Sequence, residues 1–499
     1  MDNKKGDSLS FDYGVGGLRK ETNWIGAFVI GLAGTILVTG IAPIMVTTLG
    51  AASIPITFII TLTGWLLCLF LAELAAMMPD RAGGSPAYAA PAYKKRFPGL
   101  AKHINGFTAW AYWLGWFPVA PLNMILASSY IATLAGLDTT AGFTPVHTFI
   151  AWWTLGISVV GILLFYIPAY MGIRFGASFA AILAVLSMVP LTFIAIAWIF
   201  NPSVVNFGEL AGFKHLDGSS FFSGLSGYDW LSVYLGYSFL LTWNVIAMEA
   251  AACYISECAD PDRDAKIAMN LEGGYGVLIY TLIPIALVIV IGAKGLADQS
   301  LAGADPNAMF VTFAAHIFPN GGSVLNWLIG IMLIIALSLS ALNAIMGSGR
   351  ALYQMALDGE FPRVFQQLNK HGVPARAMAF NVICSLVVVL LGGAVEIYTF
   401  SNVGYVASFL PVLVGYYLLR QDEPNARRPF RLPEFMKYVA LALALFYGIV
   451  WLYGGLVYSK IGDAQIYFYL GWATLLAYLP LYWYRRYVED ARQAVVPAE

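Results

Sequence analysis

Glu249 is the residue of this sequence most able to do chemistry, because it stands in the middle of a long apolar segment, FLLTWNVIAMEAAACYISE. The other acids of the apolar segments, Glu73, Glu257, Glu272 and Glu396, fall near predicted segment ends, so Glu249 is expected to be the one deeply placed carboxylate. Burying a charged carboxylate in hydrocarbon costs roughly 2.5–3.5 kcal/mol, so the group should protonate easily. We predict that it takes up and releases protons; a neutral acid hydrogen-bonded to a neighbouring helix is the alternative.

Uncharged polar residues accompany this acid. Thr242, Trp243 and Asn244 interrupt the same apolar segment. An aromatic ring at such a place can cover a small ligand and stack on a cation, although plain packing would also explain it. Asn123 lies deep enough in a second apolar segment to face the same interior. These residues together favour a binding site for a small polar solute.

Membrane-spanning helices are the elements expected to position these residues. The 499-residue chain is 59% hydrophobic and 11% charged, with a mean hydropathy of +0.72, whereas soluble domains have about 45–50% apolar and about 25% charged residues. Its apolar runs are continuous and about twenty residues long, as in spanning helices and unlike barrel strands. We predict an all-α polytopic membrane protein with twelve transmembrane helices. They cover residues 24–48, 54–78, 105–133, 148–170, 176–200, 229–257, 267–293, 323–346, 377–395, 398–419, 436–457 and 465–485.

The basic residues predict the orientation of the chain. In the twelve-helix scheme only three of the 27 Lys and Arg residues, Lys214, Lys294 and Lys460, lie on one side, and the remaining 24 lie on the other. Positively charged loops stay cytoplasmic, so both termini are expected in the cytoplasm and the protein in the cell (inner) membrane. The predicted parts are a cytoplasmic N-terminal tail (1–23), helices 1–5 (24–200), helices 6–10 (229–419), helices 11–12 with the preceding cytoplasmic loop (420–485) and a cytoplasmic C-terminal tail (486–499).

Several classes of protein are excluded by what the sequence contains. A net charge of -1 gives no basic excess that would attract nucleic acid. The five histidines fall in loops or at segment ends, away from any recognisable catalytic arrangement, and the four cysteines have no metal-ligand spacing. A filter-like loop or ring of like charges, typical of channels, is not seen. We therefore expect no enzyme and no cofactor or metal; a carrier of small solutes in contact with membrane lipid remains.

Two of the predicted helices carry features of interrupted helices. Range 24–48 contains GLAGTILVTGIAP, where Gly40 can adopt unusual dihedrals and Pro43 removes a ladder hydrogen bond. Range 229–257 contains the polar residues around Glu249. These helices take the first place in two halves of five helices, which is the arrangement of an inverted-repeat transporter; the alternative is that Gly and Pro are simply common in membrane helices.

Three sequence stretches resemble one family. AELAAMMPDRAGGSPAYA, YISECADPDRDAKIAMN and LSALNAIMGSGRALYQMALDGEFPRVFQQLNKHGVPARA are similar, in the same order, to motifs of the amino acid–polyamine–organocation permeases. The shared residues of the last two are Glu257, Pro261, Arg263, Asn343, Arg350, Asp358, Gly359, Pro362 and Pro374. The resemblance implies a five-plus-five inverted-repeat fold with discontinuous helices 1 and 6, alternating access, and a substrate site between those two helices.

The resemblance also implies which residues bind substrate. The six-residue spacing of Trp243 and Glu249 is similar to the arginine/agmatine exchanger branch, in which the Trp position closes over the substrate. The family's Gly-Ser-Gly break in helix 1, which takes an amino acid carboxylate, aligns with Val38, Thr39 and Gly40, so the first glycine is missing. An amine or other small organic solute then becomes a plausible substrate. The implied substrate-binding set is Thr39, Gly40, Ile41, Asn123, Trp243, Asn244 and Ala247.

A second departure from the family pattern leaves more than one coupling mechanism open. Many proton-dependent members have a Lys in helix 5 at the position that aligns with Ser187. Either Glu249 handles protons, or Ser187 forms a Na⁺ site with Ser338 or Ser340, or the protein exchanges solutes without a coupling ion. The expected function is secondary active transport of an amino acid or related small amine, proton-coupled or exchanging. An amine, polyamine or organic-cation importer, including a sodium-coupled one, is the alternative; a polyamine should need two deep acids, and the sequence indicates one.

Overall fold

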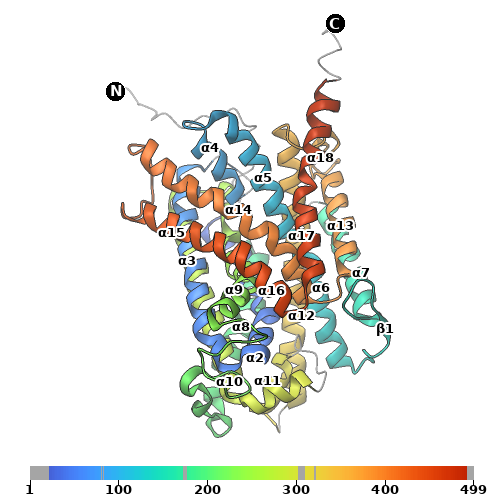
Figure 1. Ribbon diagram of the computed structural model, residues 1–499. Coiled ribbons are helices and arrows are strands. Elements are labelled where there is room, and N and C mark those ends of the chain that lie inside the picture. Colours follow the sequence, from blue (N-terminus) through green and yellow to red (C-terminus); the bar gives the residue numbers. More distant parts are fainter. Residues whose placement is uncertain are drawn as a thin grey trace.

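The computed structural model describes residues 22–79, 81, 84–171, 177–301, 309–319 and 322–491, so most of the two predicted tails lies outside it. Within these residues the chain is a bundle of helices, many of which run roughly parallel (Figure 1). The first half forms α1 (Trp24–Thr35), α2 (Val38–Leu49), α3 (Ser53–Met77), α4 (Ala89–Tyr93), α5 (Pro98–Trp116), α6 (Val119–Ala135), α7 (Trp152–Met171) and α8 (Ala177–Ile196). Short 3₁₀ helices are η1 (Gly50–Ala52), η2 (Ser85–Tyr88), η3 (Ala197–Phe200), η4 (Pro202–Val204) and η5 (Phe207–Phe213).

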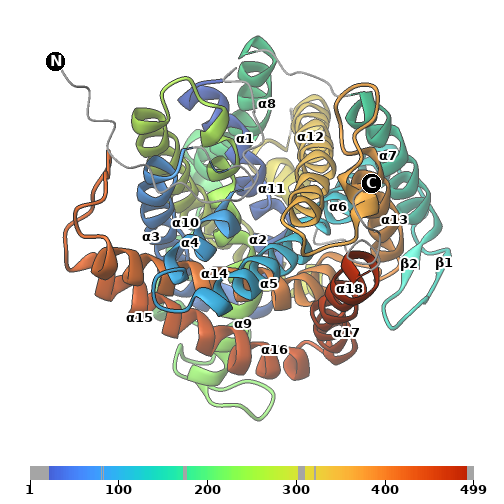
Figure 2. The same ribbon diagram turned by 90° about the horizontal axis from the view of Figure 1, so that it is seen from above.

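The second half is helical in the same way. It forms α9 (Trp230–Ile246), the 3₁₀ helix η6 (Ala247–Glu257), α10 (Pro261–Leu301), α11 (Met309–Ile317), α12 (Gly322–Leu357), α13 (Ala375–Val389), α14 (Ala394–Asp422), α15 (Met436–Ile449), α16 (Gly455–Ile461), α17 (Gln465–Leu476) and α18 (Tyr478–Trp483). Seen from above, α15 to α18 lie along one side of the bundle (Figure 2). A small antiparallel hairpin, β1 (Gly142–Phe143) with β2 (Ile150–Ala151), precedes α7.

The helices have the lengths and composition of membrane spans. Eight segments of the described residues are long and apolar enough to cross a membrane, which makes this a multi-span membrane protein. Each coincides with one of eight predicted ranges, and Val38–Met77 also takes in the end of a ninth, 24–48. The other four, 24–48, 176–200, 377–395 and 465–485, fall on helices that are interrupted or whose apolar part is shorter.

The outer surface of α7 shows why the bundle needs lipid. Val160, Leu163, Leu164 and Ile167 stand at the i, i+3, i+4 and i+7 positions of one helix face and are 46–64% exposed. A soluble protein turns such a face inward, and a contiguous apolar surface of this kind is avoided in water. Meanwhile polar side chains such as Asn123 and Glu249 are fully buried. The chain therefore places apolar residues toward lipid and polar residues toward its interior.

Candidate functional site

The first interruption lies between α1 and α2. Ile36 and Leu37 keep right-handed dihedrals, but the backbone here pairs three residues apart instead of four: Leu37 N–H donates to Gly34 at 3.2 Å, and Gly40 N–H donates to Leu37 at 3.1 Å. Thr39 adds a hydroxyl bond to the Ile36 carbonyl at 2.9 Å. The helix is tightened at this point, just before the predicted position at Val38 to Gly40, and is not unwound.

The glycine and proline that predicted this interruption have other roles. Pro43 lies inside α2, which continues to Leu49. A Cβ atom at Gly40 would lie 2.4 Å from the Tyr398 hydroxyl and 3.1 Å from Leu126. Gly40 is therefore needed because helices α14 and α6 approach α2 closely there.

The second interruption is the change from α9 to η6. After Ile246 the chain continues for 11 residues in 3₁₀ geometry, although 3₁₀ runs longer than three or four residues are uncommon and often mark a hinge. This segment lies against α1: a Cβ atom at Gly34 would be only 2.1 Å from the Ala247 carbonyl oxygen. The Tyr280 hydroxyl, from α10, reaches the carbonyls of Gly34 at 3.4 Å and Asn244 at 3.5 Å. The two interrupted helices therefore meet at their interruptions.

We expect Gly34→Ala to damage this junction. The new methyl group would press against backbone, which cannot rotate away, so we expect a destabilisation of about 1–3 kcal/mol, as in other overpacked sites, together with slower transport. Thermal unfolding of the purified protein and uptake into proteoliposomes measure both effects. Gly156→Ala on α7 is the matched control, because nothing lies within 4 Å of its Cβ position. Equal behaviour of the two variants would contradict the tight junction.

Trp243 stands at this junction among tyrosines from α14. It is fully buried; its ring centroid lies 5.0 Å from that of Tyr398 and 6.1 Å from that of Tyr405. Its indole N–H donates to the Gly115 carbonyl of α5 at 3.2 Å. Three electron-rich rings thus gather where α1 and η6 meet. Such a group of rings can bind an ammonium ion.

Glu249, in η6, is the centre of a buried hydrogen-bond network. Its carboxylate accepts bonds from Tyr112 (2.7 Å), Trp116 (3.3 Å), Tyr405 (3.1 Å) and the Ser85 hydroxyl. The donors come from α5, α14 and η2, and all four are uncharged. Tyr405 touches both Trp243 and Glu249, so it connects the aromatic group to the carboxylate.

The expectation that Glu249 is the one deeply placed carboxylate is wrong. Glu272 of α10 is also fully buried and accepts a bond from the Ala251 N–H at 3.3 Å, two residues from Glu249. Sequence reading placed it near a helix end, but α10 already begins at Pro261, which puts Glu272 about three turns inside the helix.

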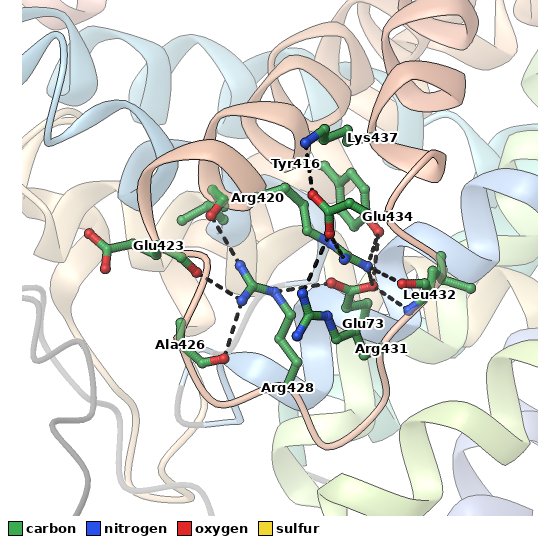
Figure 3. A network of polar contacts seen from close by, with 11 residues as sticks. Glu73, Tyr416, Arg420, Glu423, Ala426, Arg428, Arg431, Leu432, Glu434 and Lys437 are labelled. Carbon is green, nitrogen blue, oxygen red and sulfur yellow. Dashed lines mark hydrogen bonds and ion pairs between the residues drawn. The ribbon is translucent and has the colours of Figure 1, made fainter.

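Glu73 of α3 is buried as well, within the ion-pair network of Figure 3. It pairs with Arg420 at 2.6 Å and with Arg428 at 3.2 Å. The Tyr416 hydroxyl and the Leu432 N–H also donate to it, at 2.8 and 2.9 Å. The arginines come from the end of α14 and from the loop before α15, so this network fixes that loop to α3. Its role is structural and does not involve the junction.

The remaining predicted site residues occupy different places. Asn123 donates to the Ser340 hydroxyl at 2.8 Å, which joins α6 to α12, and Asn244 donates to the Leu240 carbonyl at 3.3 Å. The amide oxygens of both asparagines are buried without a partner among the described residues. Ile41 and Ala247 are buried beside the interruptions. Ser187 and Ser338 are half-buried, on α8 and α12.

Sequence reasoning missed the residues that complete the site: Ser85, Tyr112, Trp116, Glu272, Tyr280, Tyr398 and Tyr405. The tyrosines carry no local signal, because their partners are distant carbonyls and a distant carboxylate. Ser85 lies in the family-like GGSPAY stretch, which was the available signal for it.

A multi-span helical bundle whose two interrupted helices meet around buried polar groups is an arrangement typical of membrane transporters. The chain belongs to the amino acid permease family, whose sequence profile matches residues 23–475. It is similar to a D-serine/D-alanine/glycine transporter of Escherichia coli (strain K12), with 22% identity over 70% of this chain and 73% of that protein. It is also similar to an uncharacterized amino acid permease of Bacillus subtilis (24% identity, 71% and 73% covered) and an uncharacterized transporter of Legionella pneumophila (24%, 80% and 80%). Both the family resemblance and the absence of an enzymatic function, as predicted from the sequence, are confirmed.

Proposed function

We propose that this permease carries a small solute with one ammonium group, an amino acid or its amine, across the cytoplasmic membrane by alternating access coupled to protons. The observation that carries the proposal is the group of rings formed by Trp243, Tyr398 and Tyr405 at the junction of α1 and η6. The five-plus-five repeat, twelve spans and cytoplasmic termini remain part of this proposal.

Buried hydrogen-bond acceptors support recognition of an ammonium ion. The buried oxygens of Asn123 and Asn244 are acceptors without a donor among the described residues, and an ammonium group supplies donors. By contrast, the backbone N–H groups of Leu37, Thr39 and Gly40, which could receive a carboxylate, already donate to carbonyls. The ammonium group, rather than the carboxylate, is therefore proposed as the feature of the solute that is recognised.

The relatives suggest which solutes to test first. One of them is named for D-serine, D-alanine and glycine, which are all small and share the ammonium group. We propose small neutral amino acids as the substrates, with Thr39, Gly40, Ile41, Asn123, Trp243, Asn244 and Ala247 around them.

An importer of amines or polyamines is the second candidate. A polyamine needs at least two acidic groups, and the burial of Glu272 supplies a second one beside Glu249. Coupling to sodium through Ser187, Ser338 and Ser340 is the alternative to protons. Ser340 is engaged with Asn123, which favours the proton.

A competition experiment tests the proposed substrate. We expect proteoliposomes containing the protein to accumulate radiolabelled glycine. D-alanine and D-serine should compete with this uptake, and so should their amines, ethylamine and ethanolamine. N-acetylglycine, which keeps the carboxylate but lacks the ammonium group, should not compete. Competition by N-acetylglycine but not by amines would contradict the proposal, and competition by spermidine alone would favour the polyamine importer. Imposing proton and sodium gradients separately identifies the coupling ion.

A further inference from the structure

Glu272 is a buried carboxyl that the proposed transport of a solute with one ammonium group leaves without a role. A Cβ atom at Gly31 of α1 would lie 2.0 Å from its Oε2 atom, so the missing side chain of Gly31 makes the room that the carboxyl occupies. Among the described residues it receives one hydrogen bond, from the Ala251 N–H of η6 at 3.3 Å. The Oε1 atom is fully buried without a partner in the described part of the chain. Glu272 therefore lies where α1, η6 and α10 meet.

The surroundings of Glu272 contain little that would stabilise a negative charge. Within the described residues, the titratable groups that face it are Cys68, from α3, and Glu249, from η6; α1, α2 and α8 have no titratable residue. Cys68 donates its thiol hydrogen to the Met248 carbonyl, and Glu249 is a like charge. An unpaired charge in such a place is very costly, so such a group normally becomes neutral.

The surroundings of Glu249, in contrast, stabilise a negative charge. Four donors point at its two oxygens, whereas Glu272 receives one. Donors directed at a carboxylate stabilise its charged form. When two neighbouring carboxyls have such different surroundings, one can remain charged while the other exchanges protons.

We propose that Glu272 is the proton-carrying group of this transporter, taking up a proton from water when α1 and η6 close on each other and returning it to water when they separate. The inference rests on the proposed alternating access at this junction. In the closed form, protonation neutralises the Glu272 carboxylate, whose negative charge is not compensated by Ala251 or by any other described residue. When α1 moves away, water reaches the carboxyl and hydrates the charged form. Each closing of the junction then binds one proton.

Two measurements on the full-length protein test this. In infrared spectra recorded across a pH series, the wild-type protein should show the carbonyl band of a buried protonated carboxylic acid, and Glu272→Gln should lose part of that band. In proteoliposomes, Glu272→Gln should reduce accumulation of radiolabelled glycine under a pH gradient by more than about tenfold, while exchange of glycine across the membrane continues. Glu396→Gln is the matched control, because this carboxyl of α14 accepts a bond from Thr148, away from the junction.

The outcomes separate this inference from the proposed function. An unchanged infrared band in Glu272→Gln, undiminished gradient-driven accumulation, or equal loss of accumulation and exchange would each overturn it. If wild-type protein does not move glycine, the proposed substrate fails, and the infrared comparison still decides the role of Glu272. If Glu272→Gln does not fold, Glu272→Asp replaces it: the pH at which the acid band is half lost should shift, and an unshifted band would overturn the inference.

Discussion

Replacing Glu249 with alanine should reduce solute uptake by more than about tenfold and lower the thermal unfolding temperature, because four buried donors would lose their acceptor, each at a cost of about 1–3 kcal/mol. The donors Tyr112 and Trp116 come from α5, Tyr405 from α14 and Ser85 from η2. All three elements are held around η6 by this carboxylate. Uptake into proteoliposomes and a thermal-unfolding scan of the same preparation measure the two effects.

Glu249→Gln separates the charge of this residue from its hydrogen bonds. A glutamine oxygen can accept from Tyr112 and Tyr405, and its amide can donate to the Ser85 hydroxyl, which also accepts. We expect this variant to fold and to transport slowly, with the pH dependence of uptake unchanged. The sequence predicted that Glu249 couples transport to protons. If Glu249→Gln lost the pH dependence of uptake while Glu272→Gln kept it, that prediction would be supported, and the proposal that Glu272 carries the proton would be contradicted.

The fold class is largely predictable from the sequence because each membrane-spanning helix is specified by its own continuous run of apolar residues. The scarcity of charge and the continuous apolar runs predicted a multi-span helical bundle, and that prediction is confirmed. Trp243 and Glu249 could be recognised as candidate site residues because polar groups inside a membrane-spanning helix cost free energy and usually have a functional role. Both lie at the junction of α9 and η6, where the second interruption was expected.

Contacts between distant segments were not predictable in the same way. Gly40 and Pro43 predicted the site of the first interruption a few residues too late, because α2 absorbs Pro43 and Gly40 serves the approach of Tyr398. Tyr398 itself looks like ordinary aromatic packing in the sequence. The depth of Glu272 depended on where α10 begins, and helix ends are the least reliable part of such predictions.

Breaking the ion-pair network around Glu73 should also lower stability strongly. Glu73 is 1% exposed, and the side chains of its partners Arg420 and Arg428 are 2% exposed. Removing one member of a buried pair leaves an uncompensated charge and typically costs about 3–5 kcal/mol. Among the described residues, Glu73→Ala would leave Arg428 without an ion-pair partner and Arg420 paired only with Glu434, whose side chain is 53% exposed. We expect a marked fall in the thermal unfolding temperature, and release of the loop before α15 from α3, measured by faster proteolysis of that loop.

An exposed ion pair at the neighbouring end of α14 provides the control. Lys95 and Glu423 are 3.3 Å apart, with side chains 60% and 36% exposed, and such surface pairs contribute about 0–1 kcal/mol. Lys95→Ala should therefore leave the unfolding temperature almost unchanged, and any loss should disappear in high salt, which screens exposed charges. The effect of Glu73→Ala should persist in high salt, because Glu73, Arg420 and Arg428 are shielded from solvent. A Glu73→Ala protein as stable as Lys95→Ala would show that the hydrogen bonds of both arginines to backbone carbonyls are enough to hold the loop on α3.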